Sequence, residues 1–148
     1  GGRMPQDLLG FYLVRQIPPL KRRGILDQAG FERQAEQLLA GFQRRLGLSV
    51  AFGAREFASW YAVHMPEKPD VLTIENSDTA PEGGAGASYA QLLSHEINTI
   101  RDRAIVVRIG AALDRYGEVI VVYGGSHLMT QEPALRGALG AAPYEKLF

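Results

Sequence analysis

The chain has 148 residues, 46% of them hydrophobic, which is enough for one packed core and too short for two full domains. Sixteen Lys and Arg balance sixteen Asp and Glu, so the chain lacks the positive field of a general nucleic-acid binder. Because it has no cysteine, it can form no disulfide, zinc–thiolate site or thiol nucleophile, and any metal must bind His and carboxylates.

Three helices are predicted in the first half. Residues 6–16 have an apolar side and are followed by Pro18, which we expect to end the helix. Asp27 is a suitable N-cap for a strongly amphipathic second helix that ends near Gly47. A third helix is predicted at 54–64, before a proline.

A basic cluster after the first helix and an aromatic group on the third can each be interpreted in two ways. The basic cluster at 21–23 is either a solvated turn between helices or a site for an anionic partner such as a lipid headgroup. Phe57, Trp60 and Tyr61 share one side of the third helix, a spacing more typical of a core than of a ligand platform.

Residues 65–87 carry several Pro and Gly, which predicts a long loop, in which 71–74 is the only apolar stretch. Ser88 then caps a helix predicted at 89–116. Its second half is apolar on nearly all sides, so we expect it to pack on more than one face and to form the spine of the domain.

A β-branched run at 118–123, bounded by glycines, predicts a strand. It does not alternate apolar and polar residues, which is typical of a parallel strand buried on both faces. A last helix is predicted at 131–139. The expected fold is therefore α/β, with about five helices and one buried strand.

One strand cannot satisfy its own backbone groups, and 71–74 is the only candidate partner. We therefore expect either that this is the helix-rich C-terminal portion of a longer α/β protein with strands upstream, or that a second chain completes the sheet. No apolar run approaches the roughly 18 to 20 residues of a membrane span. The start of the chain lacks the pattern of a signal peptide, so we expect a soluble chain whose compartment is left open.

The residues best suited to chemistry lie between 94 and 127. Gly124, Gly125, Ser126 and His127 would place an imidazole just beyond the carboxyl end of the predicted strand, where open α/β sheets bind ligands. The alternative is a loop histidine satisfied by its neighbours.

A polar stripe is predicted on the long helix, because His95, Asn98, Thr99 and Asp102 recur at spacings of three and four. Arg101 lies beside Asp102. The alternative to a functional site is an ion-pair network that docks this helix on its neighbours.

These residues resemble a known superfamily. Ile-Arg-Asp-Arg-Ala at 100–104, followed by Val-Ile-Val-Val-Tyr-Gly-Gly-Ser-His-Leu at 119–128, is similar to the C-terminal half of the TraB/PrgY, GumN, Tiki, erythromycin-esterase and ChaN-like superfamily. Those proteins carry an Arg-Asn or Arg-Asp pair on a helix, then a strand ending in Gly-x-x-His. The sequence departs from the pattern at Ala104, where Met-Ala is common, and lacks the upstream Gly-Glu-x-His motif.

The resemblance implies a hydrolase in which water attacks a peptide or ester bond at a cleft centred on His127. His127, Arg101 and Asp102 would be catalytic, and Gly124, Gly125, Ser126, His95 and Asn98 would bind the substrate. In the Tiki-like version His127 is also a ligand of a divalent metal ion. In the erythromycin-esterase-like version histidine and carboxylate activate water directly.

The ChaN-like members suggest a different class, a non-catalytic protein that binds haem or another small ligand. Tyr123 and Met129 lie close to His127 in sequence and are compatible with a haem site. A visible absorbance band would distinguish this alternative from a hydrolase.

Overall fold

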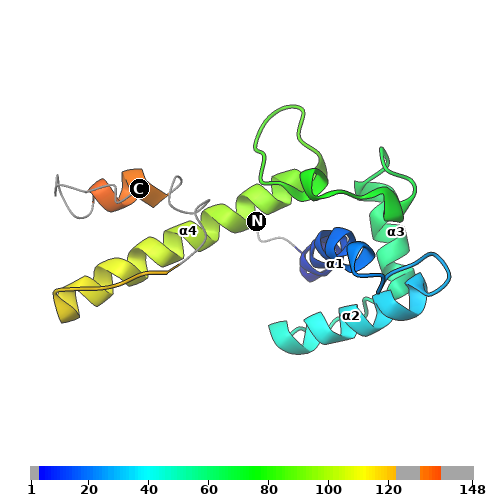
Figure 1. Cartoon of the computed structure of the whole chain (residues 1–148), viewed down its shortest axis with the longest axis horizontal. Helices are drawn as coiled ribbons and strands as arrows, with labels where there is room; N and C mark the ends of the chain where they lie inside the picture. Colours follow the sequence, from blue (N-terminus) through cyan, green and yellow to red (C-terminus); the bar gives the residue numbers. More distant parts are fainter. Residues whose placement is uncertain (1–3, 123–130, 138–148) are drawn as a thin grey trace. The chain divides into compact units, whose positions relative to one another are not determined.

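The computed structural model describes residues 4–122 and 131–137, which are predominantly helical (Figure 1). The elements are, in chain order, α1 (Pro5–Arg22), α2 (Phe31–Leu46), α3 (Ala54–His64), the 3₁₀ turns η1 (Val71–Thr73) and η2 (Asn76–Thr79), and α4 (Tyr89–Tyr116). Residues 131–137 form a further helical segment, as predicted for most of 131–139. The chain divides into two compact units, one ending at His95 and one beginning at Glu96.

The α/β prediction is wrong, because the described residues contain no strand. The described part of the predicted strand, 118–122, is irregular, and Ile120 is 94% exposed; the last predicted strand residue lies outside the described ranges. A β-branched run forms a strand only where a neighbour takes its N–H and C=O groups. The expected partner at 71–74 instead winds largely into η1, so no ladder forms.

Helix α1 supplies the centre of the first unit and packs against α2, α3, η1 and η2. At Gly10, α1 lies directly against Trp60 of α3, because a Cβ at this position would lie 2.5 Å from the Trp60 ring. Only glycine therefore fits this contact without a rearrangement. The buried residues of α1 are Leu9, Gly10, Phe11, Leu13, Val14, Ile17 and Pro18.

Helix α1 is longer than predicted, because it does not end before Pro18. It continues to Arg22 with Pro18 and Pro19 inside it. Proline removes a backbone donor and usually ends a helix. Here Ile17 and Pro18 are buried, so core packing compensates for the lost hydrogen bonds.

Helix α3 has the predicted bounds, and α2 ends as predicted at Gly47, but Asp27 is not the N-cap of α2, because the helix begins at Phe31 after Gly30. Before α2, Asp27 Oδ1 accepts a 2.7 Å hydrogen bond from the Gly30 N–H, so Asp27 orders the turn that leads into the helix. The helix ends at Gly47, whose φ of 64° is in the left-handed region typical of a helix C-terminus. At the start of α3, Glu56 Oε2 accepts from the Gly53 N–H at 2.9 Å.

The predicted loop at 65–87 contains no α-helix and no strand, but it is anchored to the core. Ile74 is almost completely buried. The Lys68 ammonium lies 3.1 Å from Asp78 Oδ2, and the Tyr61 hydroxyl donates a 2.6 Å hydrogen bond to the Lys68 carbonyl oxygen. The loop therefore adds packed and polar contacts to the first unit.

Helix α4 has the predicted bounds but not the predicted burial. Within it the buried residues are Ala90, Leu93 and Ser94, all in the first two turns. The apolar section at 104–113 is largely half-buried or exposed, with Val107 70% exposed, so the prediction of a spine packed on several faces is wrong. Among the helices described, none has the length and apolar composition needed to cross a membrane.

Candidate functional site

The predicted site residues fall into two groups. Gly124, Gly125, Ser126 and His127, together with Tyr123 and Met129, lie outside the described residues. The other group, His95, Asn98, Arg101 and Asp102, lies on α4, and its helical spacing is confirmed.

Asp102 is the best-defined member of the predicted site. Its side chain is half-buried, and Oδ1 accepts a 2.8 Å hydrogen bond from Gln131 Nε2. Gln131 lies 29 residues after Asp102 in the sequence. It begins the helical segment at 131–137, which follows the Gly-Gly-Ser-His stretch. The hydrogen bond therefore joins the Arg101–Asp102 turn of α4 to the helical segment at 131–137.

Gln131 was not predicted as part of this site. It is only 1% exposed, and its Oε1 has no hydrogen-bond partner. A buried carbonyl oxygen without a donor is destabilising by about 1 to 3 kcal/mol. The only sequence signal is a polar residue at the start of a predicted helix.

Arg101 and Asn98 flank Asp102 on the helix. The Arg101 side chain is exposed, so its guanidinium is accessible to a ligand. Asn98 is half-buried and lies one turn before Asp102, on the same face of the helix. The described part of the predicted site in the second unit thus contains the Arg101 guanidinium, the Asp102 carboxylate and the side-chain amides of Asn98 and Gln131.

His95 belongs to the first unit and has different neighbours. A Cβ at Gly83 would lie 3.0 Å from His95 Nε2, so the loop at 81–87 passes close to the imidazole. Its contact with this loop gives His95 a packing role that the sequence did not suggest.

A divalent metal ion is not supported by the described residues alone. They contain no group of three or more His, Asp and Glu side chains that could hold one. The predicted metal ligand, His127, lies outside the described residues.

A second polar cluster, which the sequence did not reveal, lies in the first unit. Asp7 Oδ1 accepts a 3.0 Å hydrogen bond from Trp60 Nε1 and lies 3.9 Å from His64 Nε2. The His64 ring stacks on Tyr89, with 4.1 Å between centroids. Burial acts to raise the pKa of Asp7, but hydrogen bonds from Trp60, Tyr89 and the Met4 N–H, with His64 nearby, hold the pKa below its usual value. This cluster joins α1, α3 and the start of α4.

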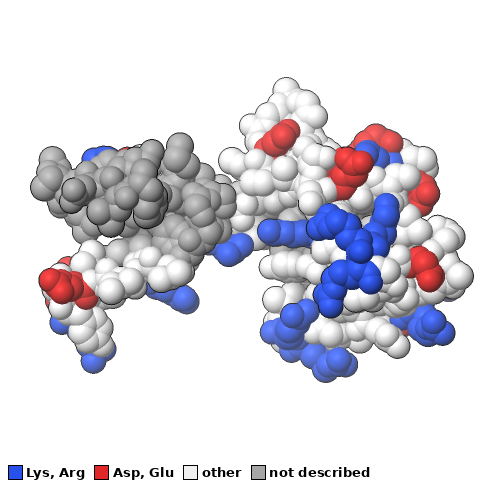
Figure 2. All heavy atoms as spheres, in the orientation of Figure 1, with Lys and Arg blue, Asp and Glu red and all other residues white. Residues whose placement is uncertain are grey.

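The basic cluster at 21–23 lies at the C-terminal end of α1 and is exposed. Figure 2 shows that Lys and Arg side chains gather on one face of the first unit. Positive charge at a helix C-terminus stabilises the helix dipole, which explains the cluster without a partner.

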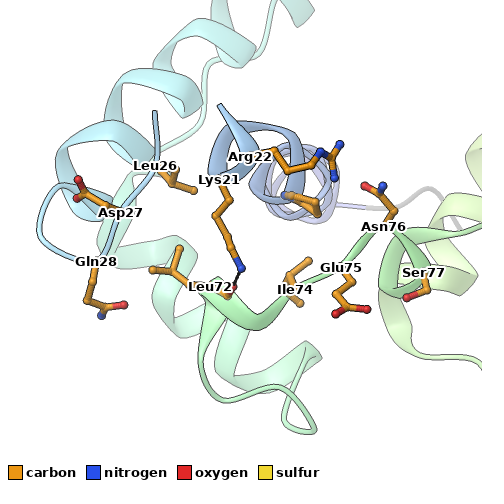
Figure 3. A pocket seen from close by; sticks show the side chains of 11 residues that line it. Lys21, Arg22, Leu26, Asp27, Gln28, Leu72, Ile74, Glu75, Asn76 and Ser77 are labelled. Atoms are coloured by element: carbon orange, nitrogen blue, oxygen red, sulfur yellow. Dashed lines mark hydrogen bonds between the residues drawn. The ribbon is translucent and has the colours of Figure 1, made fainter. Parts of the chain in front are cut away.

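A hollow of about 880 Å³ lies beside this cluster, between the end of α1 and the η1–η2 loop (Figure 3). Lys21 Nζ reaches across it to donate a hydrogen bond to the Leu72 carbonyl oxygen. The lining pairs two cations, Lys21 and Arg22, with two carboxylates, Asp27 and Glu75. Because these formal charges cancel, the hollow does not favour an anion.

Comparisons with protein-family models, with curated proteins and with solved structures each find no match to this chain. The superfamily resemblance therefore stays a prediction based on the motifs themselves.

Proposed function

We propose that this chain is a hydrolase in which His127, Asp102 and Arg101 promote the attack of water on a peptide or ester bond. The observation that carries the proposal is the 2.8 Å hydrogen bond between Gln131 Nε2 and Asp102 Oδ1. Gln131 follows His127 by four residues in the sequence, so this bond supports a site that combines His127 with the Arg-Asp pair of α4. The two motifs come from sequence segments far apart, and a hydrolytic site needs both.

Each of the three side chains has a distinct role in this proposal. His127 accepts a proton from water while the water oxygen bonds to the carbonyl carbon. Arg101 stabilises the negative charge that develops on the carbonyl oxygen. Asp102 favours the imidazolium that forms, which then donates its proton to the leaving alcohol or amine as the C–O or C–N bond breaks. Asn98, which is half-buried on the Asp102 face of α4, is suited to binding a polar group of the substrate.

The proposal is tested by assaying the purified protein against p-nitrophenyl esters of increasing chain length and against fluorogenic peptides. His127→Ala should lower kcat/KM by about 10² to 10⁴-fold, the range for loss of a general base. Arg101→Gln should lower it by about 10²-fold, as for loss of one oxyanion contact. Circular dichroism should show the same helical signal for wild type and both variants.

Helix α4 offers matched controls. Asp114 and Arg108 are exposed residues of the same helix, outside the proposed site. Asp114→Asn and Arg108→Gln should leave kcat/KM unchanged, whereas Asp102→Asn should lower it. The hydrolase proposal fails if the wild type hydrolyses none of these substrates, or if His127→Ala is as active as wild type.

The same purified protein also tests the haem-binding alternative. A Soret band that appears with haem and is lost in His127→Ala, without any hydrolysis, would replace the catalytic proposal with a ligand-binding one.

A further inference from the structure

We propose that the first unit carries a second, separate binding site, which takes a small, neutral, apolar molecule. The site is a pocket of about 400 Å³ formed by the start of α2, one side of α3 and the loop after α3. This volume is at the small end of the range for ligand pockets and fits a short alkyl chain or a single ring system.

The base of the pocket is apolar and rigidly packed. Phe57, Tyr61 and Met65 line it, and all three are at least 95% buried. The Phe57 and Tyr61 rings pack against each other at 5.7 Å between centroids. These side chains are core residues on one side, as predicted, and present the rest of their surface to the pocket.

The entrance is formed by residues that keep the pocket open. Ala58 and Ala62 are exposed on α3, and their methyl groups are too small to cover the opening. Pro66 and Pro69 also line the pocket, and their rings cannot fold inwards as a flexible side chain can.

The loop that carries these prolines is held in place. Lys68, between them, pairs with Asp78 at 3.1 Å, and its N–H donates to the Met65 carbonyl oxygen at 3.1 Å. The pocket is therefore formed before a ligand enters, and little ordering cost opposes binding.

The chemistry of the lining selects against charged ligands. Among the described residues, no charged side chain lines the pocket. Its one polar side-chain group, the Tyr61 hydroxyl, already donates to the Lys68 carbonyl oxygen at 2.6 Å. Burial, reinforced by nearby carboxylates such as Asp78, raises the pKa of Tyr61, so the phenol stays neutral. A charged ligand would lose its hydration without gaining a partner.

The test compares three ligands of equal length, 1-hexanol, hexanoate and hexylammonium, by NMR titration of the full chain. 1-Hexanol should shift signals of residues around the pocket and bind at least about tenfold more tightly than either charged analogue. Equal binding of the three ligands, or no binding of 1-hexanol, would overturn the proposal.

Two neighbouring positions on α3 provide a matched pair of variants. Ala62→Phe fills the entrance and should weaken 1-hexanol binding by about tenfold or more. Val63→Phe adds the same ring at a residue that is 71% exposed and does not line the pocket, so it should bind like wild type. Ala58→Phe tests the entrance independently if Ala62→Phe does not fold.

Sedimentation analysis distinguishes a small ligand from a second copy of the chain as the occupant. The proposal requires a pocket that is open in the monomer. The proposal would be contradicted if the chain self-associates, if Ala62→Phe abolishes this association, and if 1-hexanol does not compete with it. The hydrolase assay is independent of these results, because the pocket and the α4 site lie in different units.

Discussion

At the scale of single residues, Asp7 shows how one side chain joins distant parts of the first unit. It accepts hydrogen bonds from Trp60 Nε1 and the Met4 N–H, and it lies beside His64. A carboxylate that accepts several hydrogen bonds is stabilised in its charged form. Nothing in the local sequence predicts this arrangement, because Trp60 and His64 lie on α3, far along the chain from Asp7.

Asp7→Asn should lower the free energy of unfolding by about 1 kcal/mol at neutral pH, because one charge-assisted acceptor is lost. The pKa of Asp7 is lower in the folded chain than its usual value, so the Asp7 carboxylate stabilises the fold fully at any pH above the usual aspartate pKa. This stabilisation is lost as the pH falls through the pKa that Asp7 has in the folded state. Urea unfolding at several pH values should therefore show the wild type and the variant converging in acid. A constant difference at all pH values would contradict this assignment.

At the scale of elements, two glycines of α2 have opposite roles. Gly41 is inside the helix with open space where a Cβ would be, whereas Gly47 ends the helix with φ at 64°. Alanine is favoured over glycine within a helix and disfavoured in the left-handed region.

Gly41→Ala should raise the free energy of unfolding by about 0.5 to 1 kcal/mol, and Gly47→Ala should lower it by about 1 kcal/mol. Thermal unfolding followed by circular dichroism measures both, and each variant is the control for the other. If the two substitutions shift Tm in the same direction, the left-handed conformation of Gly47 does not stabilise the end of α2.

The helices show what periodicity can predict. The bounds of α3 and α4 follow from apolar spacing, caps and prolines, which act over a few residues. The prediction of a strand at 118–122 was wrong because strand formation depends on a partner elsewhere in the chain. The prediction that α1 ends before Pro18 was wrong for a similar reason, since tertiary burial overrides local propensity.

At the scale of the whole molecule, burial is unevenly distributed. The buried hydrophobic side chains of the described residues lie between Leu9 and Leu93, and so within the first unit. The part of α4 that belongs to the second unit, from Glu96 onward, has no buried hydrophobic side chain. Local unfolding is easiest where few apolar contacts are broken.

Hydrogen exchange should therefore separate the two units. Amides of α1 and α2 should exchange only by global unfolding, whereas those of α4 after His95 should exchange at least about tenfold faster through local opening. Mass spectrometry of peptic fragments resolves the two regions. Equal protection across all of α4 would show that the second unit is as stable as the first.

The candidate site was only partly accessible to sequence reasoning. The polar stripe of α4 follows from helical spacing; Asp102 lies on it as predicted, and Arg101 is its neighbour in the sequence. The contribution of Gln131 could not be predicted, because it depends on a hydrogen bond across 29 residues. The pocket on α3 was also missed, because aromatic residues at helical spacing have the same pattern whether they face only a core or a core and a pocket.

The central claim is that the residues around His127 meet the face of α4 that carries Asp102, and disulfide trapping tests it most directly. The chain has no cysteine, so introduced pairs form the only possible bridges. Asn98 lies on the Asp102 face, and Val107, nine residues further on, lies on the opposite face. A disulfide forms only where the Cα atoms come within about 7 Å. Under mild oxidation, Asn98→Cys with His127→Cys should form an intramolecular disulfide at least about tenfold faster than Val107→Cys with His127→Cys. Equal rates, or faster bridging to position 107, would contradict the account.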